Sequence, residues 1–168
     1  MKKVQIIAEA GVNHNGKESL AIELIDKAVL CGADIIKFQT FVAEDLVSKK
    51  AKQAEYQKKN SKKIEPQFNM LKKLELNHDT FLRLQKYSEK KGIKFLSTAF
   101  DIKSLKFLTN NLNLDTLKIA SGELTNAPLI LEHAKTKKNI ILSTGMATFE
   151  EIEKTLGIFA FGFINKKG

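Results

Sequence analysis

Five short apolar runs recur along the chain, and each of them ends in polar residues. They cover residues 6–16, 34–40, 95–98, 117–123 and 140–145. Between these runs, apolar residues recur at helical spacing, which predicts helices over residues 19–30, 80–91, 102–112, 127–136 and 149–159. Strands that alternate with helices indicate an α/β fold with a parallel sheet, whose strands are buried on both faces and read as continuous apolar runs.

The spacing of the expected strands is regular. They start near residues 4, 34, 93, 115 and 139. Such spacing is typical of a (β/α) barrel, in which eight units need about 250 residues. The 168 residues of this chain hold five expected strands. The pattern therefore leaves two architectures open, an open five-stranded sheet and an incomplete TIM barrel with about five of its eight units.

One interval between the expected strands, residues 42–77, is longer than the others. It contains lysine-rich runs at residues 49–52 and 58–63. We expect an exposed, partly helical insertion after the second strand. Its charge has two interpretations, a solvated face or a lid that attracts and encloses an anionic ligand.

Charge and cysteine content narrow the class of protein. The 28 basic and 19 acidic side chains give a net charge of +9, which favours an acidic partner such as a phosphate or a carboxylate.

A single cysteine, Cys31, rules out an intrachain disulfide framework. We expect it to be buried at a helix end, in a reducing compartment. Neither a membrane span nor a signal peptide is expected from the apolar runs, so the predicted location is the cytoplasm.

Charged residues on neighbouring strands share one face. Side chains alternate between the two faces of a strand, so Lys37 and Gln39 lie on the same face of the second expected strand. The same alternation places Glu9 of the first strand and Lys118 of the fourth strand on that face. If helices cover the other side, Glu9, Lys37 and Lys118 converge at one mouth of the barrel. Buried charges need partners, so either an anionic ligand or an internal ion-pair network occupies this mouth.

Two turns that follow expected strands could bind an anion through their backbone. Residues 121–123 and 143–145 come just before expected helices, where free N–H groups attract anions. Ordinary helix capping explains one such turn, but two in consecutive units favour a phosphate site.

The histidines do not form a recognisable metal motif. His14 lies in a predicted tight turn at residues 13–16, where a metal ligand, an acid–base group and a simple turn residue are the alternatives. His78 and His133 fall on expected helices without ligand spacing. Patterns for Ser/His/Asp triads, Cys-x-x-Cys sites and Walker loops are also absent from the sequence.

Four segments together resemble motifs of the sialic acid synthase family, which makes N-acetylneuraminate, legionaminate and pseudaminate. They are residues 7–16, 32–40, 118–123 and 142–146, and the resemblance covers residues 4 to about 156. It implies a TIM barrel that condenses phosphoenolpyruvate with an N-acylated amino-sugar aldehyde, such as N-acetylmannosamine. The expected product is a nine-carbon 2-keto acid, and phosphate is released. The resemblance also implies a divalent metal, Mn or Mg, that polarises the aldehyde.

The resemblance assigns roles to individual residues. Glu9, acting on the proton or water of the tetrahedral intermediate, and Lys37, binding phosphoenolpyruvate, are the expected catalytic residues. The expected substrate-binding residues are Lys118, Ser121, Ser143 and Thr98 for phosphoenolpyruvate, and Gln39 and Glu123 for the amino sugar.

Two departures from the family pattern shape the prediction. Ala99 stands where the family often has proline after Ser-Thr, which should affect the stiffness of the turn more than the chemistry. Family members are also about twice as long, with later strands that carry two metal-ligand histidines and with a small antifreeze-like domain. We therefore expect residues 1–168 to be the N-terminal part of such an enzyme, inactive or impaired alone, with the metal ligands outside this chain. A homodimer is the implied assembly.

Two other functions remain as alternatives. One is another phosphoenolpyruvate-dependent synthase that makes shorter 3-deoxy keto acids. The other is a non-enzymatic half-barrel that binds phosphate ligands or nucleic acid. Nucleic acid is disfavoured as a partner because the lysine-rich segment contains a single aromatic residue, Tyr56, for base stacking.

Overall fold

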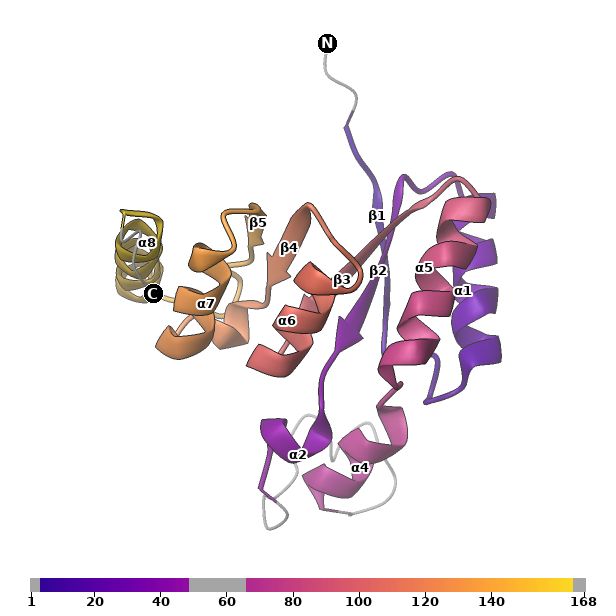
Figure 1. Ribbon diagram of the computed structural model, residues 1–168, viewed down its shortest axis with the longest axis horizontal. Helices are drawn as coiled ribbons and strands as arrows, with labels where there is room; N and C mark the ends of the chain where they lie inside the picture. The colour runs from indigo at the N-terminus through magenta and orange to yellow at the C-terminus, as the bar shows by residue number, and fades with distance from the viewer. Residues whose placement is uncertain (1–3, 49–65, 165–168) are drawn as a thin grey trace.

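The computed structural model describes residues 4–48 and 66–164. Its sheet has five parallel strands that lie side by side in the order of the sequence (Figure 1). The strands are β1 (Ile7–Gly11), β2 (Ile35–Thr40), β3 (Lys94–Ala99), β4 (Thr116–Ile119) and β5 (Asn139–Leu142). Parallel neighbours joined through helices are the arrangement of a (β/α) barrel. The predicted fold class is therefore confirmed, with five barrel units in the described residues.

Each strand is followed by a helix that crosses back along the outer side of the sheet. These helices are α1 (Glu18–Leu30), α5 (His78–Lys90), α6 (Ile102–Asn110), α7 (Ala127–Lys135) and α8 (Phe149–Ile164). The five predicted helices are confirmed, although α8 extends beyond its expected end at residue 159. Two shorter helices, α2 (Ala43–Leu46) and α4 (Gln67–Leu74), lie beyond the carboxyl end of β2 (Figure 1). The lysine-rich runs lie outside the described residues.

Helix starts follow from capping residues in the sequence. The side chain of Asn77 accepts a hydrogen bond from Thr80 N–H at 2.8 Å, and Asp101 accepts one from Ser104 N–H at 2.7 Å. These side chains satisfy N–H groups that have no partner within the helix. Asn126 caps α7 in the same way, and a proline occupies the first turn of that helix.

The main core lies between the sheet and the outer helices. Ile36 and Phe38 of β2 are fully buried there with Ile25 of α1 and Leu84 of α5. The Phe38 ring stacks on Phe95 of β3 with ring centroids 5.5 Å apart. Burying one such side chain stabilises the fold by about 2 kcal/mol. Covering this face leaves the alternate side chains of the strands on the inward face, where the charged residues lie.

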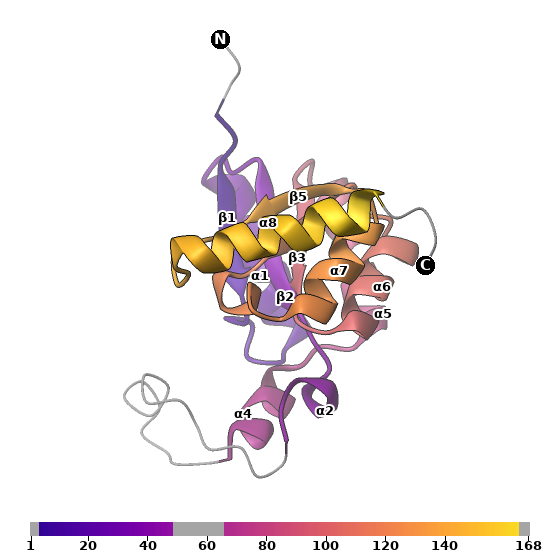
Figure 2. The same cartoon turned by 90° about the vertical axis from the view of Figure 1, so that its left-hand side faces the viewer.

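A second apolar cluster joins the last two units. It contains Ile119 of β4, Ile130 and Ala134 of α7, and Phe159 of α8. Gly162 packs so closely on α7 that an added Cβ would lie 2.6 Å from the Ala134 side chain. Figure 2 shows α8 in front of β5 and beside α7 at this end of the layer.

Two details of the sequence prediction are corrected. Strands were expected to be buried on both faces, but Ile7 of β1 is 37% exposed, because no second layer covers the inward face within residues 4–48 and 66–164. Cys31 was expected to be buried, but it is exposed where α1 ends and the chain turns toward β2. Among the described helices, none has the length and apolar character needed to cross a membrane.

Candidate active site

A row of charged and polar side chains crosses the first four strands on the inward face. Glu9 of β1 lies opposite Lys37 of β2, and their side chains form an ion pair between Oε2 and Nζ. Lys37 Nζ also donates to Thr98 Oγ1 of β3 at 3.5 Å. Thr98 in turn lies opposite Lys118 of β4. The structure thus brings Glu9, Lys37 and Lys118 together, as the alternation of side chains predicts.

The electrostatics of this row favour an anion. Lys37 is buried, whereas the Glu9 side chain is half-exposed and can neutralise only one of the two lysines. Burial lowers the pKa of Lys118, and the positive charge of Lys37 lowers this pKa further, while Glu9 opposes the shift. Two lysines held close together beside one carboxylate leave a net positive charge, which a bound anion would relieve.

Gln39 belongs to the same face. It lies two residues beyond Lys37 on β2, is half-buried, and pairs in register with Thr98. Its amide can both donate and accept hydrogen bonds, so it suits a neutral polar group better than a phosphate.

The other predicted site residues lie at the same edge of the sheet, beyond the ends of β4 and β5. Ser121 and Glu123 are in a single 3₁₀ turn, η1 (Ser121–Glu123), and Glu123 accepts a hydrogen bond from Asn126 Nδ2 at 2.9 Å. Ser143 follows β5, and its N–H donates to the carbonyl of Ile119 at 3.1 Å. In the described part of the chain, none of the three makes a direct polar contact with the charged row.

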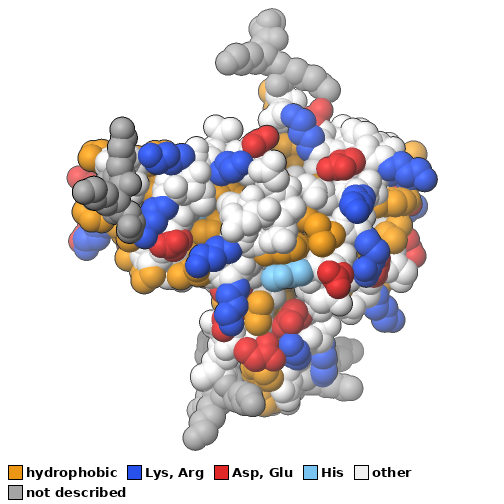
Figure 3. Space-filling model, in the orientation of Figure 1, with side chains coloured by type: hydrophobic (Ala, Val, Ile, Leu, Met, Phe, Trp, Pro, Cys, Tyr) orange, Lys and Arg blue, Asp and Glu red, His pale blue; other side chains and the backbone are white. Residues whose placement is uncertain are grey.

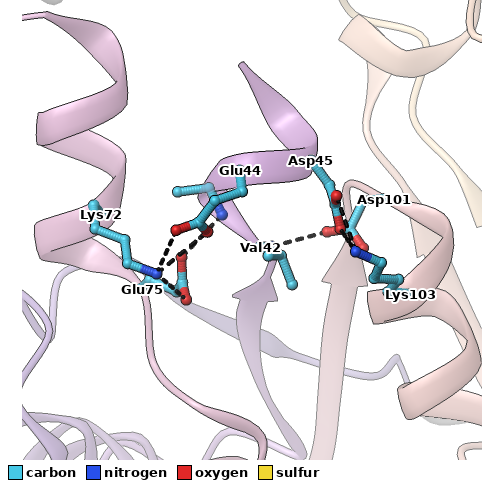
Figure 4. Close-up of polar contacts among 8 residues, drawn as sticks. Val42, Glu44, Asp45, Lys72, Glu75, Asp101 and Lys103 are labelled. Carbon is cyan, nitrogen blue, oxygen red and sulfur yellow. Dashed lines mark hydrogen bonds and ion pairs between the residues drawn. The ribbon is translucent and has the colours of Figure 1, made fainter. Parts of the chain in front are cut away.

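The short helix α2 fixes the path of the chain just after β2. Glu75, which follows α4, accepts a hydrogen bond from Ala43 N–H at 2.9 Å. Asp101, at the start of α6, accepts one from Val42 N–H, also at 2.9 Å. Figure 4 shows these two carboxylates approaching α2 from opposite sides. They satisfy the first N–H groups of a helix that is too short to stabilise itself.

Two ion pairs reinforce the same helix. Lys72 of α4 pairs with Glu44 at 3.1 Å, and Lys103 of α6 pairs with Asp45 at 2.7 Å (Figure 4). A hydrogen bond to Asp45 raises the pKa of Lys103. Both pairs are solvent-exposed and contribute little to stability, so the backbone hydrogen bonds hold α2 more firmly.

His14 is a turn residue rather than a member of the charged row. Its Nδ1 accepts a hydrogen bond from Gly16 N–H at 3.1 Å, which leaves the proton of the neutral ring on Nε2. The ring is buried with its centroid 6.2 Å from that of Phe38, and burial lowers its pKa. Asn15 and Gly16 have positive φ, which confirms the predicted tight turn. The structure therefore favours the turn-residue interpretation.

A metal centre is not assembled by the described residues. No group of three His, Cys, Asp or Glu side chains that could hold a metal ion occurs within residues 4–48 and 66–164. The carboxylate of Glu9 is engaged by Lys37. The described residues therefore do not provide a complete site for the divalent cation that the resemblance implies.

Sequence reasoning missed several residues that shape the site. Asp101 and Glu75 hold the segment after β2, and only the Asp-x-x-Ser cap at residues 101–104 left a recognisable signal. Thr40 and Ser97 share a buried hydrogen bond of 2.7 Å between β2 and β3 on the helix side. Their pairing depends on the register of two strands that are far apart in sequence.

The fold and the position of the charged row define the class of the protein. They make it a (β/α)-barrel protein with polar chemistry at the carboxyl ends of its strands, where barrel enzymes have their active sites. The NeuB family model matches residues 24–167, and the chain belongs to this family.

Individual relatives agree with this assignment. The N,N'-diacetyllegionaminic acid synthase of Campylobacter jejuni is 50% identical over 158 residues, which are 94% of this chain and 47% of the relative. The crystal structure of N-acetylneuraminic acid synthetase from Leptospira borgpetersenii in complex with citrate matches 96% of this chain and 52% of its own, with 34% identity and a TM-score of 0.80. This chain spans about half the length of the relatives it matches.

A more distant structure shares the fold alone. Phospho-2-dehydro-3-deoxyheptonate aldolase of Thermotoga maritima matches 96% of this chain and 39% of its own, with a TM-score of 0.65 and 14% identity. The chain therefore shares its arrangement of strands and helices with this aldolase.

Proposed function

We propose that this chain supplies the phosphoenolpyruvate-binding part of a synthase that condenses phosphoenolpyruvate with an N-acylated amino-sugar aldehyde. The observation that carries the proposal is the inward row of Glu9, Lys37, Thr98 and Lys118. Membership of the NeuB family supports it, because the curated relatives include legionaminic acid synthases and N-acetylneuraminate-9-phosphate synthases.

The proposed roles follow from charge and position. Phosphoenolpyruvate carries a phosphate and a carboxylate, and the ammonium groups of Lys37 and Lys118 would bind and neutralise them in a partly desolvated site. Ser121, Ser143 and Thr98 would add neutral hydrogen bonds to the same ligand. The geometry of the row supports the binding role of the two lysines, because both lie on the inward face and Thr98 lies next to each of them.

The carbon–carbon bond would form between C3 of phosphoenolpyruvate and the aldehyde carbon of the sugar. Water would add to C2, and phosphate would leave as the 2-keto acid forms. Glu9 would move a proton of this water or of the intermediate, while Gln39 and Glu123 would hold the sugar. A divalent cation, when bound, would polarise the aldehyde, but the part of the chain that the structure describes offers no complete set of ligands for it.

We further propose that residues 1–168 form the N-terminal units of a longer barrel, with residues 42–77 as an insertion, and that turnover needs the later units. The coverage of about half of each relative supports this division. A homodimer and a cytoplasmic location remain predictions.

The alternative functions have less support. Similarity to the heptulosonate-type aldolase is at 14% identity, whereas the legionaminic acid synthase is 50% identical, which favours an amino-sugar acceptor. Figure 3 shows basic and acidic side chains intermingled over the face in view, and this pattern gives no support to a basic stripe for nucleic acid.

Calorimetric titration of phosphoenolpyruvate tests the proposal. We expect binding by the chain, and a loss of roughly 10- to 100-fold in affinity for Lys37→Ala and for Lys118→Ala, because each removes a charge-assisted hydrogen bond. Lys106→Ala is the control, since Lys106 is exposed on α6, away from the row. Binding that is absent, or that survives both lysine substitutions, contradicts the proposal. Sustained phosphate release with N-acetylmannosamine and Mn²⁺ by this chain alone would contradict the need for later units.

A further inference from the structure

The first strand carries one extra residue next to the charged row. The register of β1 on β2 runs Glu9 opposite Lys37 and then Gly11 opposite Phe38, so Ala10 is an additional residue on β1. Such a β-bulge bends the strand and changes the direction of the side chains beside it. Here it lies directly between Glu9 and the turn that leads to α1.

Gly11 occupies the space between two groups of the site. Its φ is +53°, and an added Cβ would lie 3.3 Å from Glu9 Oε1 and 3.6 Å from Gln39 Nε2. Glu9 uses its other oxygen, Oε2, for the ion pair with Lys37. The carboxylate of Glu9 and the amide of Gln39 therefore flank the position that a side chain at residue 11 would take.

We infer that Gly11 is a positioning residue, whose missing side chain lets the Glu9 carboxylate lie against Lys37 and keeps the space between Glu9 and Gln39 free for substrate. This inference rests on the proposed function for the identity of the substrate. The geometry between Glu9, Lys37 and Gly11 is independent of it.

The bulge does not take residue 11 out of the row. An added Cβ at Gly11 would still approach Glu9 and Gln39, so the absence of a side chain is what leaves this space open. A contact of 3.3 Å between a Cβ and a carboxylate oxygen is tighter than ordinary packing, so the carboxylate would have to shift by a few tenths of an ångström. Because Oε1 and Oε2 belong to one rigid group, this shift also displaces the oxygen that pairs with Lys37.

A comparison of Gly11→Ala with Gly32→Ala separates crowding of the Glu9 carboxylate from the strain of a positive φ. Gly32 has φ +73° and nothing within 4 Å of an added Cβ, so Gly32→Ala introduces the strain of a positive φ without crowding. If Gly11→Ala does not fold, Gly11→Asn replaces it, with Gly32→Asn as its control. Asn15 and Asn113 already adopt φ of 50° and 48° in this chain, so asparagine tolerates the conformation.

The experiment is a double-substitution cycle read by phosphoenolpyruvate affinity. In the wild-type background, Glu9→Gln should tighten binding about fivefold, because it removes the negative charge that neutralises Lys37. In the Gly11→Ala background, the same substitution should tighten binding by clearly less than fivefold, because the displaced carboxylate neutralises Lys37 less completely. The Gly32→Ala background should keep the full fivefold effect. Equal effects of Glu9→Gln in all three backgrounds would overturn the inference.

A second measurement keeps the inference separate from the proposed function. Nuclear magnetic resonance of the Glu9 carboxyl carbon and the Lys37 ammonium needs no ligand. Gly11→Ala should shift both signals, whereas Gly32→Ala should leave them unchanged. If phosphoenolpyruvate does not bind the wild-type chain, the proposed function fails, and these signals alone decide the role of Gly11. Unchanged signals in Gly11→Ala would overturn that role.

Discussion

At the scale of single residues, two histidines are buried where they cannot easily be charged. His14 lies under the turn after β1, and His133 lies in α7, where its Nδ1 and the carbonyl oxygen of Leu129 are 2.8 Å apart. In each ring Nε2 is buried without a hydrogen-bond partner among the described residues. Burial lowers the pKa of both histidines, and for His133 the hydrogen bond to Leu129 opposes the shift.

These histidines make the stability of the fold depend on pH. Below the ordinary histidine pKa of about 6.5, the unfolded chain binds more protons than the folded chain. The stability present above that pH is therefore lost as the pH falls toward the lowered folded-state values. We expect the free energy of unfolding in urea to be smaller at pH 5.5 than at pH 7.5. The variants His14→Gln and His133→Gln should each reduce this difference, and an undiminished difference in both would refute the explanation.

The residues of the charged row illustrate what alternation along a strand can and cannot predict. The alternation of side chains along each strand, which has a period of two, predicted that Glu9, Lys37 and Lys118 share one face. It could not reveal that Ala10 is a bulge, since a bulge depends on the register of β1 against β2. The direct ion pair between Glu9 and Lys37 depends on the same register and was one of two open interpretations.

At the scale of elements, α2 depends on side chains from other parts of the chain. It has four residues, and Glu75 and Asp101 accept hydrogen bonds from backbone N–H groups at its start. Asp101 also accepts hydrogen bonds from Ser104 N–H and Ser104 Oγ, both at 2.7 Å. One buried carboxylate thus caps α6 and fixes the chain that leaves β2.

Removal of this carboxylate should therefore destabilise two elements at once. We expect Asp101→Ala to lower the free energy of unfolding by about 1–2 kcal/mol, the usual range for a lost N-cap or a buried hydrogen bond. Asp101→Asn should lose less, because asparagine also caps helices well. Urea denaturation measures both changes. Asp115→Ala, which removes an exposed ion pair with Lys138, is the control with little expected effect. An Asp101→Ala loss no larger than that of the control would show that Asp101 is dispensable.

The bounds of the longer helices were predictable, whereas for the shorter ones the sequence predicted only that the interval 42–77 is partly helical. The apolar periodicity of α1, and that of α7 together with its Asn126 cap, is enough to read these helices from the sequence within one or two residues. The length of α8 was underestimated because residues 157–164 are apolar on most sides, which hides the helical period. The bounds of α2 and α4 depend on contacts between distant residues, such as Lys72 with Glu44, which no local pattern encodes.

At the scale of the whole molecule, five parallel units leave an inward face that is only partly covered. Ile7, which shares the inward face of β1 with Glu9, is 37% exposed, whereas the outward residues Ile36 and Phe38 are fully buried. The spacing of strands in the sequence predicted the five units. It could not decide between an open sheet and part of a barrel, because closure depends on how the strands curve and pair in space. The match to barrel structures over 96% of the chain resolves that choice.

The central claim is that the inward row binds phosphoenolpyruvate between Lys37 and Lys118. A crystal structure of the chain with phosphoenolpyruvate tests this claim most directly. We expect oxygen atoms of the phosphate and the carboxylate within hydrogen-bond distance, about 2.7–3.2 Å, of both ammonium groups. Phosphoenolpyruvate bound elsewhere on the chain, or an inward face on which the two lysines lie apart without ligand, would contradict the claim.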